Sequence, residues 1–213
     1  LDVRLTIDLQ VQQFADEQLI DTMGAAIVMN AENGEILAMA THPFFNPNDI
    51  NEKWEDWVND PQSPLINRNT QAQYPLGAAI GPFVLAKTIE NAYLPTPPQN
   101  LSINFQGTNW MCATEMSADN EWGELIINGC PRAIQLLGSQ LEDYHYTGMY
   151  EDLEFLEPTR IRLPSATGTF SDTLDNPLLV GKGIPLLRIP PLQLAKAAAA
   201  LSNQGIMPEP RIV

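Results

Sequence analysis

The sequence predicts an α+β fold with antiparallel strand pairing, and three features near its start carry that prediction. Residues 3–7 alternate between polar and apolar types as a strand does, and a helical pattern of apolar residues follows them. Two apolar stretches, 25–30 and 35–41, are then separated by a linker that contains Asn33-Gly34. Asn-Gly favours a hairpin because both residues tolerate positive φ angles. The order strand, helix, hairpin is typical of an α+β layer.

The first helix has a suitable residue type at each end. Asp8 is expected to be its N-cap, because a carboxylate there accepts hydrogen bonds from free backbone N–H groups. Gly24 can end it, since glycine readily adopts the left-handed conformation that follows many helices. Between these residues the apolar side chains recur near the helical period. They are Leu9, Val11, Phe14, Ala15, Leu19 and Ile20.

The rest of the chain is expected to be mostly helical. A short helix is expected over 50–58. A mostly apolar helix is expected over 78–93, and it is stopped by the prolines that follow it, Pro95, Pro97 and Pro98. The last clear helix follows Pro190-Pro191 and is capped by Gly205. The other expected elements are short helices over 121–127, 132–141 and 148–155, with irregular stretches over 100–120 and 167–176.

Composition and charge limit the possible classes of function. At 213 residues the chain is most simply one domain, and its 44% hydrophobic content suits a folded globule. The formal net charge is −15, from 26 acidic and 11 basic residues, so neither nucleic acid nor anionic lipid is expected as a partner. No apolar run reaches 18 residues, and no segment is expected to span a membrane. Because the chain begins on Leu1 at the expected first strand, we expect an excised piece of a longer protein.

The most informative stretch is residues 74–83, which read Tyr-Pro-Leu-Gly-Ala-Ala-Ile-Gly-Pro-Phe. It resembles the start of the active-site helix in penicillin-binding-protein transpeptidases, which reads Tyr-Pro-Pro-Gly-Ser-x-x-Lys-Pro-Phe. In that family the Ser is the acylated nucleophile and the Lys helps to remove its proton. Ala78 stands at the Ser position and Gly81 at the Lys position. The frame of the motif is therefore present, but its reacting groups are not.

The resemblance extends from residue 5 to residue 205, with six further blocks in the order of the family. The blocks are Leu-Thr-Ile-Asp-Leu-Gln-Val-Gln at 5–12, Asn-Gly-Glu-Ile-Leu-Ala-Met-Ala at 33–40, His-Pro-Phe-Phe-Asn-Pro-Asn at 42–48, Asn-Arg-Asn-Thr at 67–70, Gly-Lys-Gly at 181–183, and Pro-Leu-Gln-Leu-Ala at 191–195 with Ser-Asn-Gln-Gly at 202–205.

The resemblance implies a β-lactamase/transpeptidase-like fold, in which a mostly antiparallel sheet packs with helices and a helical subdomain adds to it. Residues 1–44 and the C-terminal part would form the sheet layer, and residues 45–190 the helical subdomain. It also implies a place at the extracytoplasmic face of a bacterial membrane, with an anchor outside this chain. Peptidoglycan or cell-wall synthesis proteins would be the partners.

The catalytic motifs of the family are degenerate here. Its second motif, Ser-x-Asn, falls by position on 129–131, where Gly129 and Pro131 replace the reactive pair. Its third motif, Lys-Thr/Ser-Gly, would come after Val213. None of the four lysines follows a Ser, Thr or Cys by three residues. The residues therefore predict a transpeptidase-like domain with no intact catalytic site, whose role is structural, binding or assembly.

Cys112 and Cys130 flank 17 residues rich in polar and turn-forming types. Two free cysteines are common in cytosolic proteins, but the extracytoplasmic place that the resemblance implies favours a disulfide between them.

Four alternatives to this interpretation remain open. In the first, the parent protein is a functional D,D-transpeptidase or β-lactam binder that uses other residues. In the second, Cys130 is a nucleophile paired with His42 or His145. In the third, the carboxylates near the tryptophans form a glycosidase pair; they are Glu55, Asp56 and Asp60. In the fourth, the same carboxylates form only a solvated helix face. Because no cluster has metal-ligand spacing and no Gly-rich phosphate loop is present, neither a metal nor a cofactor is expected.

Overall fold

The structure, a computed structural model, describes residues 2–91, 93–116, 120–171 and 187–213. The chain divides into two compact units. Unit 1 consists of Leu1–Tyr74, Leu153–Thr169 and Ile189–Val213, and unit 2 of Pro75–Asp152 and Phe170–Arg188. Three short strands, β3 (Tyr74–Pro75), β6 (Thr169–Phe170) and β7 (Leu187–Ile189), lie where the chain passes from one unit to the other. Within the described residues, every helix is too short or too polar to traverse a bilayer.

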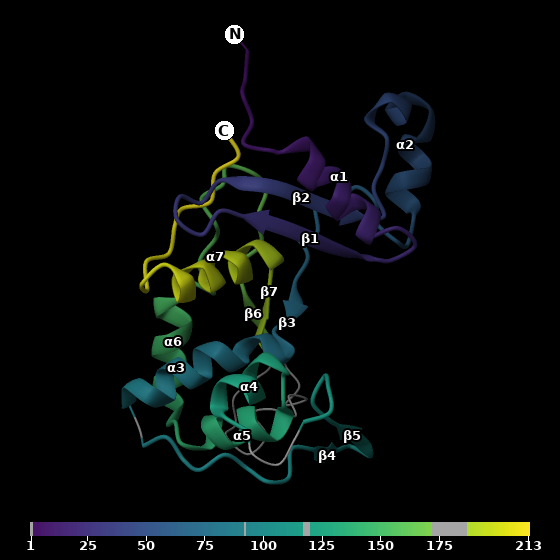
Figure 1. The fold of residues 1–213 in the computed structure, drawn as a ribbon. Helices are drawn as coiled ribbons and strands as arrows, with labels where there is room; N and C mark the ends of the chain where they lie inside the picture. The colour runs from purple at the N-terminus through teal and green to yellow at the C-terminus, as the bar shows by residue number, and fades with distance from the viewer. Residues whose placement is uncertain (1, 92, 117–119, 172–186) are drawn as a thin grey trace. The chain divides into compact units, whose positions relative to one another are not determined.

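Unit 1 is built on an antiparallel hairpin of β1 (Gly24–Met29) and β2 (Ile36–His42), which confirms the predicted pairing (Figure 1). Gly24 lies opposite His42 and the register shifts once, between Val28 and Met29. Two helices pack on the hairpin, α1 (Leu9–Gln18) against β2 and α7 (Pro191–Ser202) against β1. The α+β fold class is therefore correct.

The start of α1 is also as predicted. The Asp8 side chain accepts hydrogen bonds from the backbone N–H groups of Gln10 and Val11. Ala15 on this helix packs against Ala38 and Ala40 of β2 in a small buried cluster. Residues 3–7, in contrast, do not form a strand. Thr6 is held instead by hydrogen bonds from its N to Ile212 O at 3.0 Å and from its hydroxyl to Ile36 O at 2.6 Å and Arg211 O at 3.3 Å.

Unit 1 also contains residues 45–74, which the sequence placed in the helical part. This stretch holds η1 (Pro47–Asp49) and α2 (Ile50–Asn59). It is joined to the hairpin by Asn69, which is fully buried and whose side-chain amide donates to Ala40 O at 2.7 Å. Asn69 O in turn accepts from Leu192 N on α7 at 3.0 Å. Hydrogen bonds of this kind, which the sequence does not reveal, assign the stretch to the sheet unit.

Unit 2 is mostly helical, with one two-stranded sheet (Figure 1). Its elements are η2 (Gly77–Ile80), α3 (Gly81–Asn91), β4 (Ile103–Phe105), β5 (Thr108–Trp110), α4 (Trp122–Ile127), α5 (Pro131–Ser139) and α6 (Asp143–Asp152). Leu125, Cys130 and Ala133 form a buried cluster, against which Leu101 and Trp122 pack.

Three elements of unit 2 differ from the prediction, and one of them, α6, begins five residues before the helix expected over 148–155. Ala78 does not begin an α-helix, because Pro82 has no N–H to donate to Ala78 O. Gly81 N donates to that oxygen instead, which gives a 3-10 turn before α3. The expected irregular stretch 100–120 contains the β4–β5 hairpin, whose turn residues Gln106 and Gly107 both have positive φ.

Candidate functional site

Two positions of the first motif lie close together but in different surroundings. Ala78 is exposed on η2, whereas Gly81, the first residue of α3, is buried. The two residues are three apart in the chain, so they are separated by about one 3-10 turn and share a face. A hydroxyl at position 78 and an amine at position 81 would be neighbours. The alanine at position 78 offers only a methyl group, and the glycine at position 81 has no side chain.

The Gly81 position has little room for a side chain. A β-carbon built there would lie 3.2 Å from Cγ2 of Ile126 and 3.3 Å from Cγ1 and Cδ1 of Ile134. Both isoleucines are almost inaccessible, with 6% and 0% of their surface exposed. A lysine at position 81 would therefore begin its side chain among apolar groups, where an ammonium is poorly solvated. Sequence reasoning missed these two isoleucines, whose only signal was their place in apolar helical patterns.

The second motif lies at the end of α4, where Gly129 adopts φ +59°. Gly129 N donates to Ile126 O at 3.0 Å, and Cys130 N donates to Leu125 O at 2.9 Å. This pair of hydrogen bonds is the Schellman motif, which ends a helix through one left-handed residue. Glycine is suited to that position because it has no β-carbon. Pro131 follows as the first residue of α5, where its missing N–H costs no hydrogen bond.

The structure brings the two degenerate motifs together within unit 2. A β-carbon built on Gly129 would lie 3.0 Å from Cβ of Ala78. That distance is shorter than a normal carbon–carbon contact. The residue at the family's Ser position therefore packs directly against the residue at the first position of its second motif. The side chains at positions 78 and 129 are a methyl group and a hydrogen atom, and neither is a nucleophile or a base.

Cys112 and Cys130 form a disulfide, with their Cα atoms 4.1 Å apart. Cys130 is fully buried at the start of α5. Ala113 N donates to Asn128 O at 2.8 Å, so the bridge and this hydrogen bond both hold the segment after β5 to the end of α4. The sulfur of Cys130 is consequently not available as a nucleophile.

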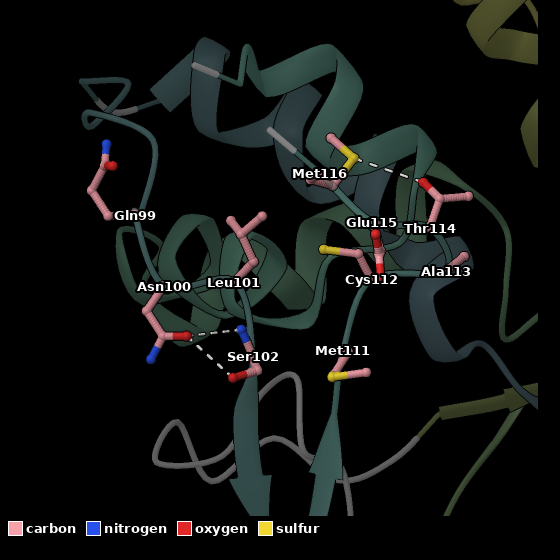
Figure 2. A pocket seen from close by; sticks show the side chains of 10 residues that line it. All are labelled: Gln99, Asn100, Leu101, Ser102, Met111, Cys112, Ala113, Thr114, Glu115 and Met116. Carbon is pink, nitrogen blue, oxygen red and sulfur yellow. Dashed lines mark hydrogen bonds between the residues drawn. The ribbon is translucent and has the colours of Figure 1, made fainter. Parts of the chain in front are cut away.

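A pocket of about 500 Å³ lies beside the disulfide (Figure 2). Two chain segments, 99–102 and 111–116, line it. Figure 2 shows the Cys112 sulfur pointing across the pocket toward Leu101. The side-chain oxygen of Asn100 accepts from the backbone N and the hydroxyl of Ser102, both at 3.1 Å. This pocket is separate from the meeting point of Ala78 and Gly129, and neither residue lines it.

Two buried tyrosines on α6 are the most perturbed titratable groups in the described chain. Burial raises the pKa of Tyr146 above its usual range and that of Tyr150 to about 12. The Tyr146 hydroxyl donates to Gly138 O at 2.9 Å. Their rings lie 6.4 Å apart. Both groups stay neutral at physiological pH, and their packing marks them as part of the core of unit 2.

The remaining candidates of the sequence have other partners or lie outside the described residues. His145 Nδ1 accepts from Glu142 N at 3.0 Å, and His42 belongs to the other unit. Lys87 Nζ pairs with Glu90 at 3.1 Å and Asp152 at 3.6 Å. The Gly181-Lys182-Gly183 block lies outside the described residues. No set of three or more His, Cys, Asp or Glu residues in the described chain is placed to hold a metal ion.

Comparison with known families gives one match over most of the chain. The model described as "Penicillin binding protein transpeptidase domain" matches residues 24–213. Among curated proteins, the chain is 28% identical over 247 residues to peptidoglycan D,D-transpeptidase MrdA of Escherichia coli K12, and 24% identical over 241 residues to penicillin-binding protein 3 of Bacillus subtilis. All of this chain is covered in both, but only 37% and 34% of those proteins.

Solved structures show the same fold at lower identity. The D,D-transpeptidase domain of a peptidoglycan glycosyltransferase from Eggerthella lenta superposes with a TM-score of 0.80 at 21% identity, covering 100% of this chain and 57% of that one. Penicillin-binding protein PBP2 from Helicobacter pylori gives 0.79 at 22%, covering 98% and 44%. A penicillin G acyl-enzyme complex of penicillin-binding protein A from Mycobacterium tuberculosis gives 0.78 at 22%, covering 98% and 54%.

Proposed function

Because the chain belongs to the penicillin-binding protein transpeptidase domain family, we propose that it is a non-catalytic member with a structural, binding or assembly role in peptidoglycan synthesis. The single observation that carries the proposal is the contact between the Ala78 and Gly129 positions, with Gly81 packed against Ile126 and Ile134. The nucleophile, its base and the first residue of the second motif are thus replaced by groups that pack together.

The loss of turnover that follows from removing a nucleophile is large enough to support this proposal. Removing only the nucleophile of a serine hydrolase lowers turnover by a factor of about 10⁶. Here the base is lost as well, and the sulfur of Cys130, which follows Gly129 in the chain, is held in a disulfide. Acylation by a β-lactam needs the same nucleophile, because it forms the same kind of ester. We therefore expect neither peptide exchange nor covalent penicillin binding.

The setting of the proposal comes from the relatives. One of them is a peptidoglycan D,D-transpeptidase, and one solved Helicobacter pylori structure contains PBP2 together with MreC. These favour a place for this chain among cell-wall proteins, with a protein of that machinery as partner. The Cys112–Cys130 disulfide favours an oxidising compartment, which agrees with the extracytoplasmic side of a bacterial membrane.

The proposal is tested by incubating the chain with fluorescent penicillin at millimolar concentration and measuring its intact mass. Penicillin-binding protein A of Mycobacterium tuberculosis, which forms a penicillin G acyl-enzyme, serves as the positive control. We expect the control to gain the mass of the drug and this chain to remain unmodified. A penicillin adduct mapped by peptide sequencing to any residue of the chain would overturn the proposal.

A further inference from the structure

Helix α2 of unit 1 presents an apolar stripe that is not covered by any other part of the described chain. Ile50, Trp54 and Val58 are 41%, 51% and 55% exposed. They follow one another at intervals of four residues, so they lie on one face of the helix. No residue of α2 is buried. Figure 1 shows the helix extending away from β1 and β2 rather than lying on either strand.

The helix is nevertheless held in place from one side. The Trp57 ring packs on Phe45, with the ring centroids 5.3 Å apart. Asn46 caps the preceding turn by accepting a hydrogen bond from Asn48 N at 3.1 Å. The helix is therefore formed before any partner binds, and a partner would not have to order it, which reduces the entropic cost of binding.

The surroundings of the stripe are acidic. Residues 49–60 contain five carboxylates and one lysine, Lys53. Lys53 Nζ lies 2.9 Å from Asp49, and this hydrogen bond, with the charge of Asp49, raises the pKa of Lys53. The other four carboxylates make no ion pair with the described residues. They are Glu52, Glu55, Asp56 and Asp60.

This charge decides between possible occupants of the stripe. A second copy of the chain would bring another acidic helix and a net charge of −15, and an anionic lipid surface would also be repelled. A protein surface with lysines or arginines around an apolar groove would be attracted and could form ion pairs with these carboxylates.

We infer that α2 is a recognition helix that inserts Ile50, Trp54 and Val58 into an apolar groove of a partner protein whose rim carries lysines or arginines. Helices that bind in grooves use anchors at such spacings, and here the three anchors read i, i+4 and i+8. Trp54 is the main anchor, because tryptophan side chains contribute most often to binding energy at interfaces. The acidic residues guide the encounter and fix its orientation.

The test places a photoreactive p-benzoylphenylalanine at position 58 of the protein in the cells that make it. A second variant carries the same group at Glu52, on the opposite face of the same helix. After irradiation, the cross-linked peptides are sequenced to locate the contact. We expect position 58 to react with a groove edged by basic residues on one other protein, at a yield at least ten-fold above that from position 52.

Two substitutions then test the separate parts of the inference in the position-58 variant. Trp54→Ala removes the anchor, and the pair Glu55→Lys and Asp56→Lys reverses the charge. Each is expected to lower the cross-link yield at least ten-fold. Because no α2 residue is buried, the thermal unfolding of the chain should not change, and circular dichroism checks this.

Several results would overturn the inference. These are the absence of a cross-link, equal yields from positions 52 and 58, attachment only to lipid, to a second copy or within the same chain, and a yield that the charge reversal does not change. A penicillin adduct would contradict the proposed function but would leave this result untouched, so the two can fail separately.

Discussion

The ammonium of Lys196 lies 2.7 Å from the carboxylate of Glu154, although only 3% of the lysine surface is exposed. Glu209 adds a second carboxylate oxygen at 3.3 Å. The charge of Lys196 is thus buried on α7 and compensated by two side chains that are partly open to water. A buried charge costs much more when its partners are removed than when it is itself replaced by an apolar group.

This asymmetry gives the first prediction. Glu154→Ala with Glu209→Ala leaves the lysine unpaired and should lower the free energy of unfolding by about 3 kcal/mol, whereas Lys196→Met should change it by less than about 1 kcal/mol. Urea unfolding followed by circular dichroism measures both. The control is Lys53→Met, which removes a paired but exposed lysine and should leave stability near that of the parent. If Lys196→Met destabilises the chain more than the double glutamate variant does, the loss of stability does not come from leaving a buried charge unpaired.

The second prediction concerns Gly129. Gly129→Ala places a β-carbon on a left-handed residue and 3.0 Å from Ala78, so it should destabilise the chain by about 1–2 kcal/mol. Gly123 on α4 is the matched control, because a β-carbon there meets no atom within 4 Å. Gly123→Ala should stabilise the helix by roughly 0.5–1 kcal/mol. Equal effects of the two substitutions would contradict the assigned role of Gly129 as the cap of α4.

The third prediction is that restoring the serine and the lysine of the first motif does not restore acylation by penicillin. Gly81→Lys crowds Ile126 and Ile134 and should lower stability by about 1–3 kcal/mol. Ala78→Ser is exposed and should be tolerated. The double variant should remain unlabelled by fluorescent penicillin, since the side chain of its lysine begins among the apolar groups of Ile126 and Ile134 and the second motif is still absent. A labelled double variant would show that positions 78 and 81 alone block the reaction.

The fourth prediction concerns the Cys112–Cys130 bridge, which closes a loop with a sequence separation of 18. Replacing both cysteines by serine should lower the free energy of unfolding by about 3 kcal/mol, because the unfolded chain regains the freedom of that loop. Dithiothreitol should have the same effect on the parent chain and none on the variant. A parent chain whose urea midpoint is insensitive to dithiothreitol, at full reduction by mass, would contradict this expectation.

The fifth prediction follows from the buried tyrosines. The pKa of Tyr150 is about 12 in the folded chain and about 10 when unfolded, so between these values the folded state holds more protons. Stability is therefore full below pH 10 and falls as the pH rises toward 12, by about 2–3 kcal/mol for this residue. Tyr150→Phe should flatten the decline in urea midpoints from pH 9 to 12. Tyr144→Phe, which alters an exposed ring, should leave the profile unchanged.

Local signals in the sequence predicted much of the fold. Asp8 marks the start of α1 because its carboxylate accepts hydrogen bonds from Gln10 and Val11, and Gly34 lies between β1 and β2 because it can adopt positive φ. The β4–β5 hairpin was missed since Gln106-Gly107 is a weaker turn signal than Asn-Gly. The apolar pattern predicts a helix that starts at Ala78, but Pro82 has no N–H to donate to Ala78 O, so α3 starts at Gly81 after a 3-10 turn.

The candidate site was predictable by position but not by packing. Motif spacing identifies 78, 81, 129 and 131, yet the closure of position 81 depends on Ile126 and Ile134, which lie more than 40 residues further along the chain. In the same way, nothing local indicates that Asn69 joins its stretch to β2 and α7. Contacts between distant residues are decided by the fold as a whole, and a single sequence contains no direct record of them.

Unit 1 consists of three separate stretches of the chain, and this affects the order in which the two units can fold during synthesis. The hydroxyl of Thr6 donates to Arg211 O, which lies 205 residues further along the chain, so this bond between the two ends must wait until that residue has been made. At a synthesis rate of 5–20 residues per second, that wait is about 10–40 s. The β1–β2 hairpin lacks α7 until Ser202 has been made, whereas the continuous stretch 75–152 of unit 2 is complete before α7 begins at Pro191. The stretch 75–152 of the helical unit can therefore begin to fold on the nascent chain before the sheet unit, which must be kept from aggregating until its last helix emerges.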